Sequence, residues 1–303
     1  TGSIGSSGIL ERFTTDYDLP NDCNYSESCA SIGMAMFGQR MGNITREAKY
    51  YDVVERALYN TVLAGIALDG KSFFYVNPLE VWPDNCLPRT SKEHVKPIRQ
   101  KWFGVSCCPP NIARTLASMG QYIYGVDGES IYVNLFISNE TTVDMGGREV
   151  SVTMETRFPW KMEVDITLRG VPESGMKLAV RIPDYAGNFA VRYVGDAGQT
   201  DGYGPALVRE KGYGIISLTG DVCLHVTWDA PARFVHSNPL VRADSGKVAL
   251  VRGPIVYCLE EADNGSNLAA VYVDPGTPVA EEEKDLFGGI IGLSFAGKKI
   301  SGR

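Results

Sequence analysis

Ser130-Ile-Tyr-Val-Asn-Leu-Phe-Ile137 alternates apolar and polar side chains and opens a series of similar stretches. A period of two residues is typical of a strand with one buried face. The later stretches are separated by Gly and Pro and lie at 149–155, 162–168, 177–182, 214–218 and 222–228. Short alternating strands at this spacing predict an antiparallel β-sandwich.

The sequence on either side of this region has a different character. Residues 1–126 are mostly helical in pattern, whereas 231–303 begin with a proline-bounded break and then show β-prone runs at 247–252 and 254–259. We therefore expect three units, 1–126, 127–230 and 231–303, with the last one truncated by the chain end. The predicted class is a multidomain α+β protein.

Apolar spacing in the first unit predicts three helices. One runs from Ser28 to Met41 and ends at Gly42, and a second runs from Thr45 to Val62. The third begins at Pro109 or Pro110, because proline is tolerated in a first helical turn. A β-prone run bounded by Asp69-Gly70 and Pro78 predicts a hairpin at 69–84, and 85–106 are a polar excursion. Helical pairs joined by long loops favour the end of an α/α barrel.

Composition restricts the partners and the compartment. The 303 residues carry a net charge of −7 and no basic run, so we expect no nucleic-acid partner. No apolar stretch approaches a membrane span, so we expect no membrane partner. Seven cysteines, two of them adjacent, indicate reduced thiols and favour a cytoplasmic protein. Thr1-Gly-Ser-Ile-Gly-Ser-Ser-Gly8 resembles an internal loop of a longer chain.

Cys107 and Cys108 are adjacent and precede two prolines. A disulfide between neighbours would be strained, so a stiff turn with two soft ligands suggests a metal site. Glu27 and Cys29 are the best further ligands, because residues two apart share a face in an extended segment. Ser26 or Ser28 would cap the helix that follows. One carboxylate and three thiolates are a plausible tetrahedral zinc set.

Other readings stay open at this point. Cysteine is often a small buried hydrophobe, and the Cys-x-x-Cys spacing of zinc ribbons is absent. Glu11 lies in a glycine- and serine-rich loop, where it is either a solvated acid or a proton donor tuned by its apolar neighbours. Cys107 and Cys108 could also act as a redox sensor.

Aromatic residues are frequent around these positions and suit stacking against a sugar ring. Among them we select Tyr75 as a substrate-binding candidate. Polar groups with a fixed direction are also available for a sugar, namely Asp16, Asn21, Asn77 and Asn111. The three histidines form no recognisable catalytic or metal-binding pattern.

Taken together, these segments resemble glycoside hydrolase family 127, the β-L-arabinofuranosidase-like enzymes. The resemblance spans most of the chain and rests on 1–5, 8–13, 17–21, 25–30, 74–78, 102–104, 107–111 and 252–260. Its most specific part is the combination of Tyr25-Ser-Glu-Ser-Cys-Ala30 with Cys107-Cys-Pro-Pro-Asn111.

The resemblance implies an (α/α)6 barrel, of which this chain holds the end, followed by antiparallel β-sandwich domains. It implies a Zn²⁺ ion on Glu27, Cys29, Cys107 and Cys108, with Cys107 as the nucleophile and Glu11 as the acid/base. The implied activity is retaining hydrolysis of a β-L-arabinofuranoside or a related sugar, so the partner is a carbohydrate, and a homodimer is possible. The alternative is a zinc-stabilised structural or carbohydrate-binding module without catalysis.

Overall fold

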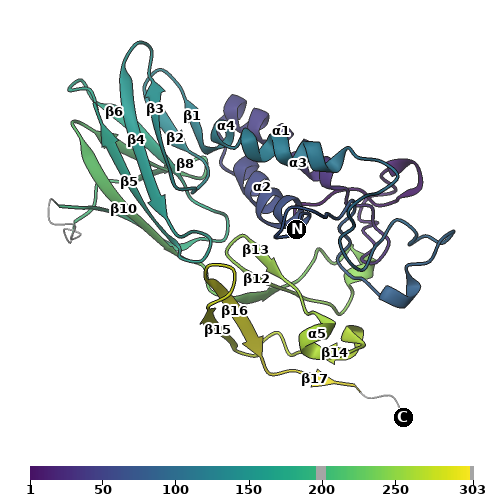
Figure 1. Ribbon diagram of the computed structural model, residues 1–303. Coiled ribbons are helices and arrows are strands. Elements are labelled where there is room, and N and C mark those ends of the chain that lie inside the picture. The colour runs from purple at the N-terminus through teal and green to yellow at the C-terminus, as the bar shows by residue number, and fades with distance from the viewer. Residues whose placement is uncertain (196–202, 301–303) are drawn as a thin grey trace.

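The fold consists of a helical layer, a β-sandwich and a group of smaller sheets. It is known from a computed structural model that describes residues 1–195 and 203–300. Figure 1 shows the helices beside one end of the sandwich, with the smaller sheets below both. The predicted mixture of α and β structure is confirmed.

The helical layer is built on α1 (Ser28–Thr45), α2 (Lys49–Ala57) and α3 (Cys108–Ala117). A π-turn, η2 (Leu58–Val62), extends α2, so the helix predicted to reach Val62 is confirmed at that end. The three helices enclose one core, which includes Ile32, Ala35, Tyr51, Val54 and Ile112. The shorter helical elements of this layer are η1 (Ile9–Glu11), η3 (Pro83–Asn85) and α4 (Gly120–Ile123).

The predicted end of the first helix at Gly42 is wrong. The helix α1 continues to Thr45, and Arg46 ends it in a left-handed conformation with φ 55°. Gly42 instead allows close packing, because a Cβ atom there would lie 2.4 Å from Cε2 of Tyr51 on α2. A glycine near a helix end therefore marked a contact between two helices.

The predicted hairpin at 69–84 is also wrong. The segment forms isolated bridges, one of them between Phe73 and the preceding Ile66 and the others to distant parts of the chain. The amide of Phe73 donates to the carbonyl of Gln100 at 2.9 Å, and the amide of Ser28 donates to that of Tyr75 at 3.0 Å. The β-prone run is therefore a buried connector that lines the beginning of α1.

Two five-stranded sheets form the sandwich, and the six predicted strands lie in them. The first has the order β1 (Tyr124–Val126), β2 (Ser130–Val133), β6 (Met176–Arg181), β9 (Tyr213–Leu218) and β8 (Val208–Glu210). The second has the order β3 (Asn139–Asp144), β4 (Glu149–Thr156), β5 (Glu163–Arg169), β10 (Val222–Asp229) and β7 (Gly187–Tyr193). Among the described strands of the sandwich, every pair is antiparallel except β2 with β6, which is parallel and departs from the prediction.

The remaining chain forms small sheets, and the two strands predicted there are present. A three-stranded sheet contains β11 (Arg233–Val235), β12 (Ala249–Arg252) and β13 (Ile255–Tyr257). Two antiparallel pairs follow, β14 (Val271–Tyr272) with β17 (Lys298–Lys299) and β15 (Val279–Lys284) with β16 (Ile290–Phe295). Short helical turns connect them, namely η4 (Arg242–Asp244), α5 (Glu261–Asn264) and η5 (Leu268–Ala270).

A buried ion network joins the helical layer to the sandwich. Arg181 on β6 is fully buried and bonds the carboxylates of Asp52 (2.6 Å) and Glu55 on α2. Burial opposes the charge on Arg181, but the two carboxylates raise its pKa above the ordinary value. Glu55 also accepts a hydrogen bond from the hydroxyl of Tyr185 at 2.8 Å. These contacts hold α2 in a fixed position against the sandwich.

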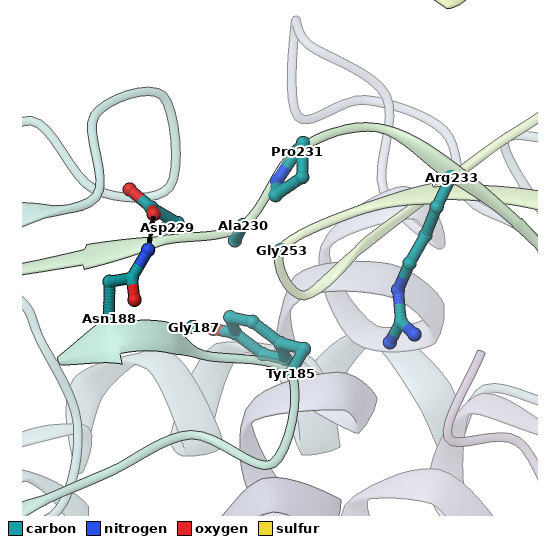
Figure 2. Close-up of a pocket in the computed structure, with 8 residues that line it drawn as sticks. All are labelled: Tyr185, Gly187, Asn188, Asp229, Ala230, Pro231, Arg233 and Gly253. Carbon is teal, nitrogen blue, oxygen red and sulfur yellow. Dashed lines mark hydrogen bonds between the residues drawn. The ribbon is translucent and has the colours of Figure 1, made fainter. Parts of the chain in front are cut away.

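A crevice of about 310 Å³ lies where the sandwich meets the three-stranded sheet. In Figure 2, Asn188 and Asp229 on the neighbouring strands β7 and β10 point toward each other, and the turn at Gly253 lies next to the ring of Tyr185. The Asn188 amide donates to the Asp229 carboxylate at 2.6 Å. None of the described helices is both long and apolar enough to cross a membrane.

Candidate metal centre and active site

Four candidate ligands come together at the N-termini of two helices. Glu27 precedes the first residue of α1 in an extended conformation, and Cys29 is the second residue of that helix. Cys107 is the residue before α3, in the same capping position as Glu27, and Cys108 is the first residue of that helix. One ligand atom from each of the four lies within 4.8 Å of the others.

The local turn before α1 differs in one respect from the prediction. Neither Ser26 nor Ser28 caps the helix, because the capping position belongs to Glu27 and carries no side-chain cap hydrogen bond. Ser26 instead has a φ of 42°, in the left-handed region. The carbonyl of Ser26 and the hydroxyl of Ser28 both accept from the amide of Asn77, at 3.2 and 3.1 Å. Asn77, expected to bind sugar, therefore holds the turn that aims Glu27.

The spacing of the donor atoms fits a tetrahedral zinc ion. Ligands about 2.3 Å from a tetrahedral ion lie about 3.8 Å from one another. The sulfur of Cys108 lies 3.6 Å from that of Cys29 and 4.0 Å from that of Cys107. The Glu27 carboxylate lies 3.4 Å from the Cys107 sulfur. The sulfur–sulfur distances also exceed a disulfide bond length, so these thiols are free.

The charge of the cluster supports the same fit. Burial raises the pKa of Cys108 well above its ordinary value, and the neighbouring Cys29 adds to this shift. Burial likewise raises the pKa of Cys29 to about 11. Three thiols beside a carboxylate cannot all ionise readily without a cation, because each negative charge disfavours the next. A bound divalent cation removes this cost, since coordinated thiols are deprotonated.

The cluster is closed on one side and open on the other. Cys108 is fully buried and Glu27 is 8% exposed, whereas Cys107 is exposed to solvent. The Cys107 sulfur lies 3.3 Å from the hydroxyl of Tyr75. Cys29 is half-buried, so Cys107 is the most accessible of the four residues to an external molecule.

Glu11 lies in an exposed turn, and Tyr25 and Tyr75 lie between it and Cys107. Leu10 and Glu11 have φ values of 58° and 50°, so the backbone of η1 is left-handed there. One carboxylate oxygen of Glu11 accepts from the hydroxyl of Tyr25 at 2.8 Å. The rings of Tyr25 and Tyr75 meet edge to face with centroids 6.1 Å apart. Contacts therefore run without a break from Glu11 to Cys107. The apolar neighbour Leu10 is 83% exposed, so it provides no enclosed setting for Glu11.

Other residues expected to bind sugar have different positions. Asp16 is exposed. Asn21 is buried, and its amide donates to the carbonyl of Ala243 at 3.3 Å. The amide of Asn111 points at the metal cluster and lies 2.9 Å from the Cys29 sulfur.

Two contributors were missed by reasoning from the sequence. Tyr25 was counted only as one of many aromatic residues, although it holds Glu11. His94 was set aside, yet its ring packs 5.7 Å from that of Tyr25 and its buried Nε2 has no partner among the described residues. Burial lowers the pKa of His94. The sequence around Tyr25 does not show that it holds Glu11. The sequence around His94 does not show that it packs against Tyr25.

Family models match three parts of the chain. The one described as β-L-arabinofuranosidase, GH127 catalytic domain, matches residues 1–121 and contains the whole cluster. The GH127 middle domain matches 130–210, and the glycoside hydrolase family 127 C-terminal domain matches 232–288.

Known proteins match along nearly the whole chain. A non-reducing end β-L-arabinofuranosidase of Bifidobacterium longum is 37% identical over 96% of this chain and 44% of its own length. The crystal structure of a GH127 β-L-arabinofuranosidase from Geobacillus stearothermophilus T6 is 41% identical, with a TM-score of 0.91, over 99% of this chain and 47% of that one. A GH127 β-arabinofuranosidase structure is 31% identical, with a TM-score of 0.84, and covers the same shares. The chain therefore spans about half the length of the relatives it matches.

Proposed function

Because this chain belongs to glycoside hydrolase family 127, we propose that it acts in the retaining hydrolysis of a β-L-arabinofuranoside or a related sugar. The observation that carries this proposal is the cluster of Glu27, Cys29, Cys107 and Cys108, in which only Cys107 faces solvent fully. Four protein ligands would fill a tetrahedral zinc ion, as in structural sites. One of them, Cys107, nevertheless has an exposed side chain that a substrate can reach. The exposure of Cys107 favours catalysis over a purely structural role.

The donor set fits a zinc ion held by Glu27, Cys29, Cys107 and Cys108. When bound, zinc keeps its thiol ligands deprotonated at neutral pH and thus supplies a thiolate. We assign the nucleophile to Cys107 and the general acid/base to Glu11. Retaining glycosidases ordinarily use two carboxylates, and here a thiolate takes the place of the nucleophilic one.

The reaction divides into two displacements. In the first, the Cys107 sulfur attacks the anomeric carbon while protonated Glu11 gives its proton to the departing glycosidic oxygen. The carbon–oxygen bond breaks, a carbon–sulfur bond forms, and Glu11 becomes a carboxylate. In the second, Glu11 takes a proton from water, the water oxygen attacks the anomeric carbon, and the thiolate leaves. Two inversions restore the original configuration.

The contacts around Cys107 and Glu11 support these roles. The Tyr75 hydroxyl, 3.3 Å from the Cys107 sulfur, is placed to contact a sugar bound at that sulfur, so we assign Tyr75 to substrate binding. Tyr25 fixes one oxygen of Glu11 and leaves the other for proton transfer. Proton transfer by a positioned side chain contributes about 10²–10⁴-fold to rate.

We also propose the larger architecture from the family. Residues 1–126 would be the end of an (α/α)6 barrel, 127–230 a sandwich domain and 231–303 part of a second β domain. The positions of the three family-model matches support this division. A homodimer and a cytoplasmic location stay predictions.

Metal content and hydrolysis of 4-nitrophenyl β-L-arabinofuranoside together test the proposal. We expect one zinc per chain, and activity that collapses in Glu11→Gln and in Cys107→Ser. Full turnover by Cys107→Ser would eliminate the thiolate nucleophile. Zinc in the wild type without any hydrolysis would favour the alternative, a zinc-stabilised structural or carbohydrate-binding module.

A further inference from the structure

Asn111 stands one helical turn after Cys107, on the same face of α3. Its side-chain nitrogen lies 2.9 Å from the Cys29 sulfur, across the boundary between α3 and α1. An amide nitrogen carries two donors and no acceptor, so this contact is an N–H···S hydrogen bond. It points at a proposed metal ligand that is 82 positions away in the chain.

Arg114 fixes the orientation of that amide. Its Nε donates to the side-chain oxygen of Asn111 at 2.6 Å, which leaves the Asn111 nitrogen directed at the sulfur. A second nitrogen of Arg114 lies 3.8 Å from the sulfur of Met36 on α1. The guanidinium group is always charged, so a permanent cation is linked to the Cys29 sulfur through two hydrogen bonds, with the Asn111 amide between them.

The negative charge of the four ligands explains why a hydrogen bond from Asn111 to Cys29 would be favourable. Three thiolates and one carboxylate carry four negative charges, and a zinc ion neutralises only two of them. The excess negative charge raises the cost of keeping every thiol ionised. A hydrogen bond donated to a thiolate from an amide polarised by Arg114 offsets part of that cost.

We propose that Asn111, oriented by Arg114, is a positioning residue of the metal centre that holds the Cys29 thiolate and strengthens metal binding. The inference rests on the metal site of the proposed function. It goes beyond that function because it assigns a role to two residues that are not ligands. Groups that orient a metal ligand typically contribute about 10–100-fold to affinity.

Competition with a chromophoric chelator on the 303-residue chain tests the proposal by zinc affinity, independently of hydrolysis. We expect Asn111→Ala to raise the zinc dissociation constant about tenfold and Asn111→Asp about 100-fold. Asp keeps the shape of Asn but places an acceptor and a negative charge against the sulfur. A packing role alone predicts the opposite order, with Ala worse than Asp.

Arg114→Gln is the second variant, and its exposed position makes misfolding a poor explanation of any effect. We expect it to weaken zinc binding less than Asn111→Ala, and to have little further effect in the Asn111→Ala background, because both act through one amide. Ala113→Asp is the matched control, since it adds the same charge to the exposed face of α3.

The thiolate-to-cobalt absorption band of the cobalt-loaded chain gives a spectroscopic measure. We expect the band to shift in Asn111→Ala and to stay unchanged in Ala113→Asp. Zinc affinities within twofold of wild type in both Asn111 variants, with an unshifted band, would overturn the proposal. A wild-type chain that binds no zinc would overturn the metal centre itself, and the inference with it.

Discussion

The hydroxyl of Tyr25 donates to Oε1 of Glu11 across 2.8 Å, and this bond ties an exposed left-handed turn to the buried residues beside the cysteine cluster. Glu11 belongs to a segment, residues 9–19, that is exposed throughout. The position of the proposed acid/base therefore depends on a residue 14 positions further along the chain.

Tyr25→Phe removes this hydrogen bond and keeps the ring that packs on Tyr75 and His94. A hydrogen bond to a charged group contributes about 1.5–3 kcal/mol, so we expect activity to fall about 10- to 100-fold on substrates with poor leaving groups. Activated aryl glycosides need little protonation and should be affected much less. Kinetics with paired leaving groups measure the difference, and Tyr17→Phe, in the same exposed loop, is the control. Equal losses on both substrates would contradict the role.

Gly42 and Gly33 lie on the same helix and offer a matched pair. A Cβ atom at Gly42 would lie 2.4 Å from the ring of Tyr51, whereas one at Gly33 would meet no atom within 4 Å. We expect Gly42→Ala to lower the free energy of unfolding by about 1–3 kcal/mol through overpacking. Gly33→Ala should raise it by about 0.5–1 kcal/mol, because alanine restricts the unfolded chain more. Urea denaturation measures both, and equal effects would mean that α1 and α2 are not in close contact.

Arg181 should be one of the most costly residues to remove. Arg181→Leu would leave the carboxylates of Asp52 and Glu55 buried without their partner. Breaking such a pair costs about 3–5 kcal/mol. Arg157→Leu, which disrupts the exposed pair with Glu283, should cost less than about 1 kcal/mol. Denaturant titration compares them, and a small loss in Arg181→Leu would show that the network does not hold α2 against the sandwich.

Because the pKa of His94 is lowered by burial, we expect the folded protein to lose stability as the pH falls. Burial lowers its pKa, so below the unfolded value of about 6.5 the unfolded chain binds more protons than the folded chain. Its contribution is fully present above that pH and is lost as the pH falls toward the folded pKa. His94→Phe should therefore lose less stability than wild type between about pH 7.5 and pH 5. Denaturation at the two pH values checks this, and identical losses would contradict it.

Strands were predictable where one face is buried along a whole element. β4 and β5 each alternate buried and exposed positions, and the sequence pattern located both within a residue or two. β3 was missed because only Val143 of its six residues is buried, so its position depends on pairing with β4. The parallel pairing of β2 with β6 joins residues 47 positions apart, such as Ile131 and Leu178, and no local pattern encodes it.

The metal cluster was predictable from residue type and local geometry. Two adjacent thiols and a carboxylate two residues before a third thiol are uncommon, so the donors could be named before their distances were known. The contacts of Tyr25 and Asn111 were not predictable, because tyrosine and asparagine have many ordinary uses. Their roles depend on neighbours brought near by the fold.

Mass spectrometry of the Glu11→Gln chain after incubation with 2,4-dinitrophenyl β-L-arabinofuranoside tests the central claim most directly. This activated substrate needs little acid assistance to glycosylate the enzyme, whereas release of the sugar needs the missing base. The account predicts that one arabinosyl group accumulates on the peptide that contains Cys107. An arabinosyl group found on a carboxylate instead, or none on a zinc-loaded chain that still releases the aryl group, would contradict it.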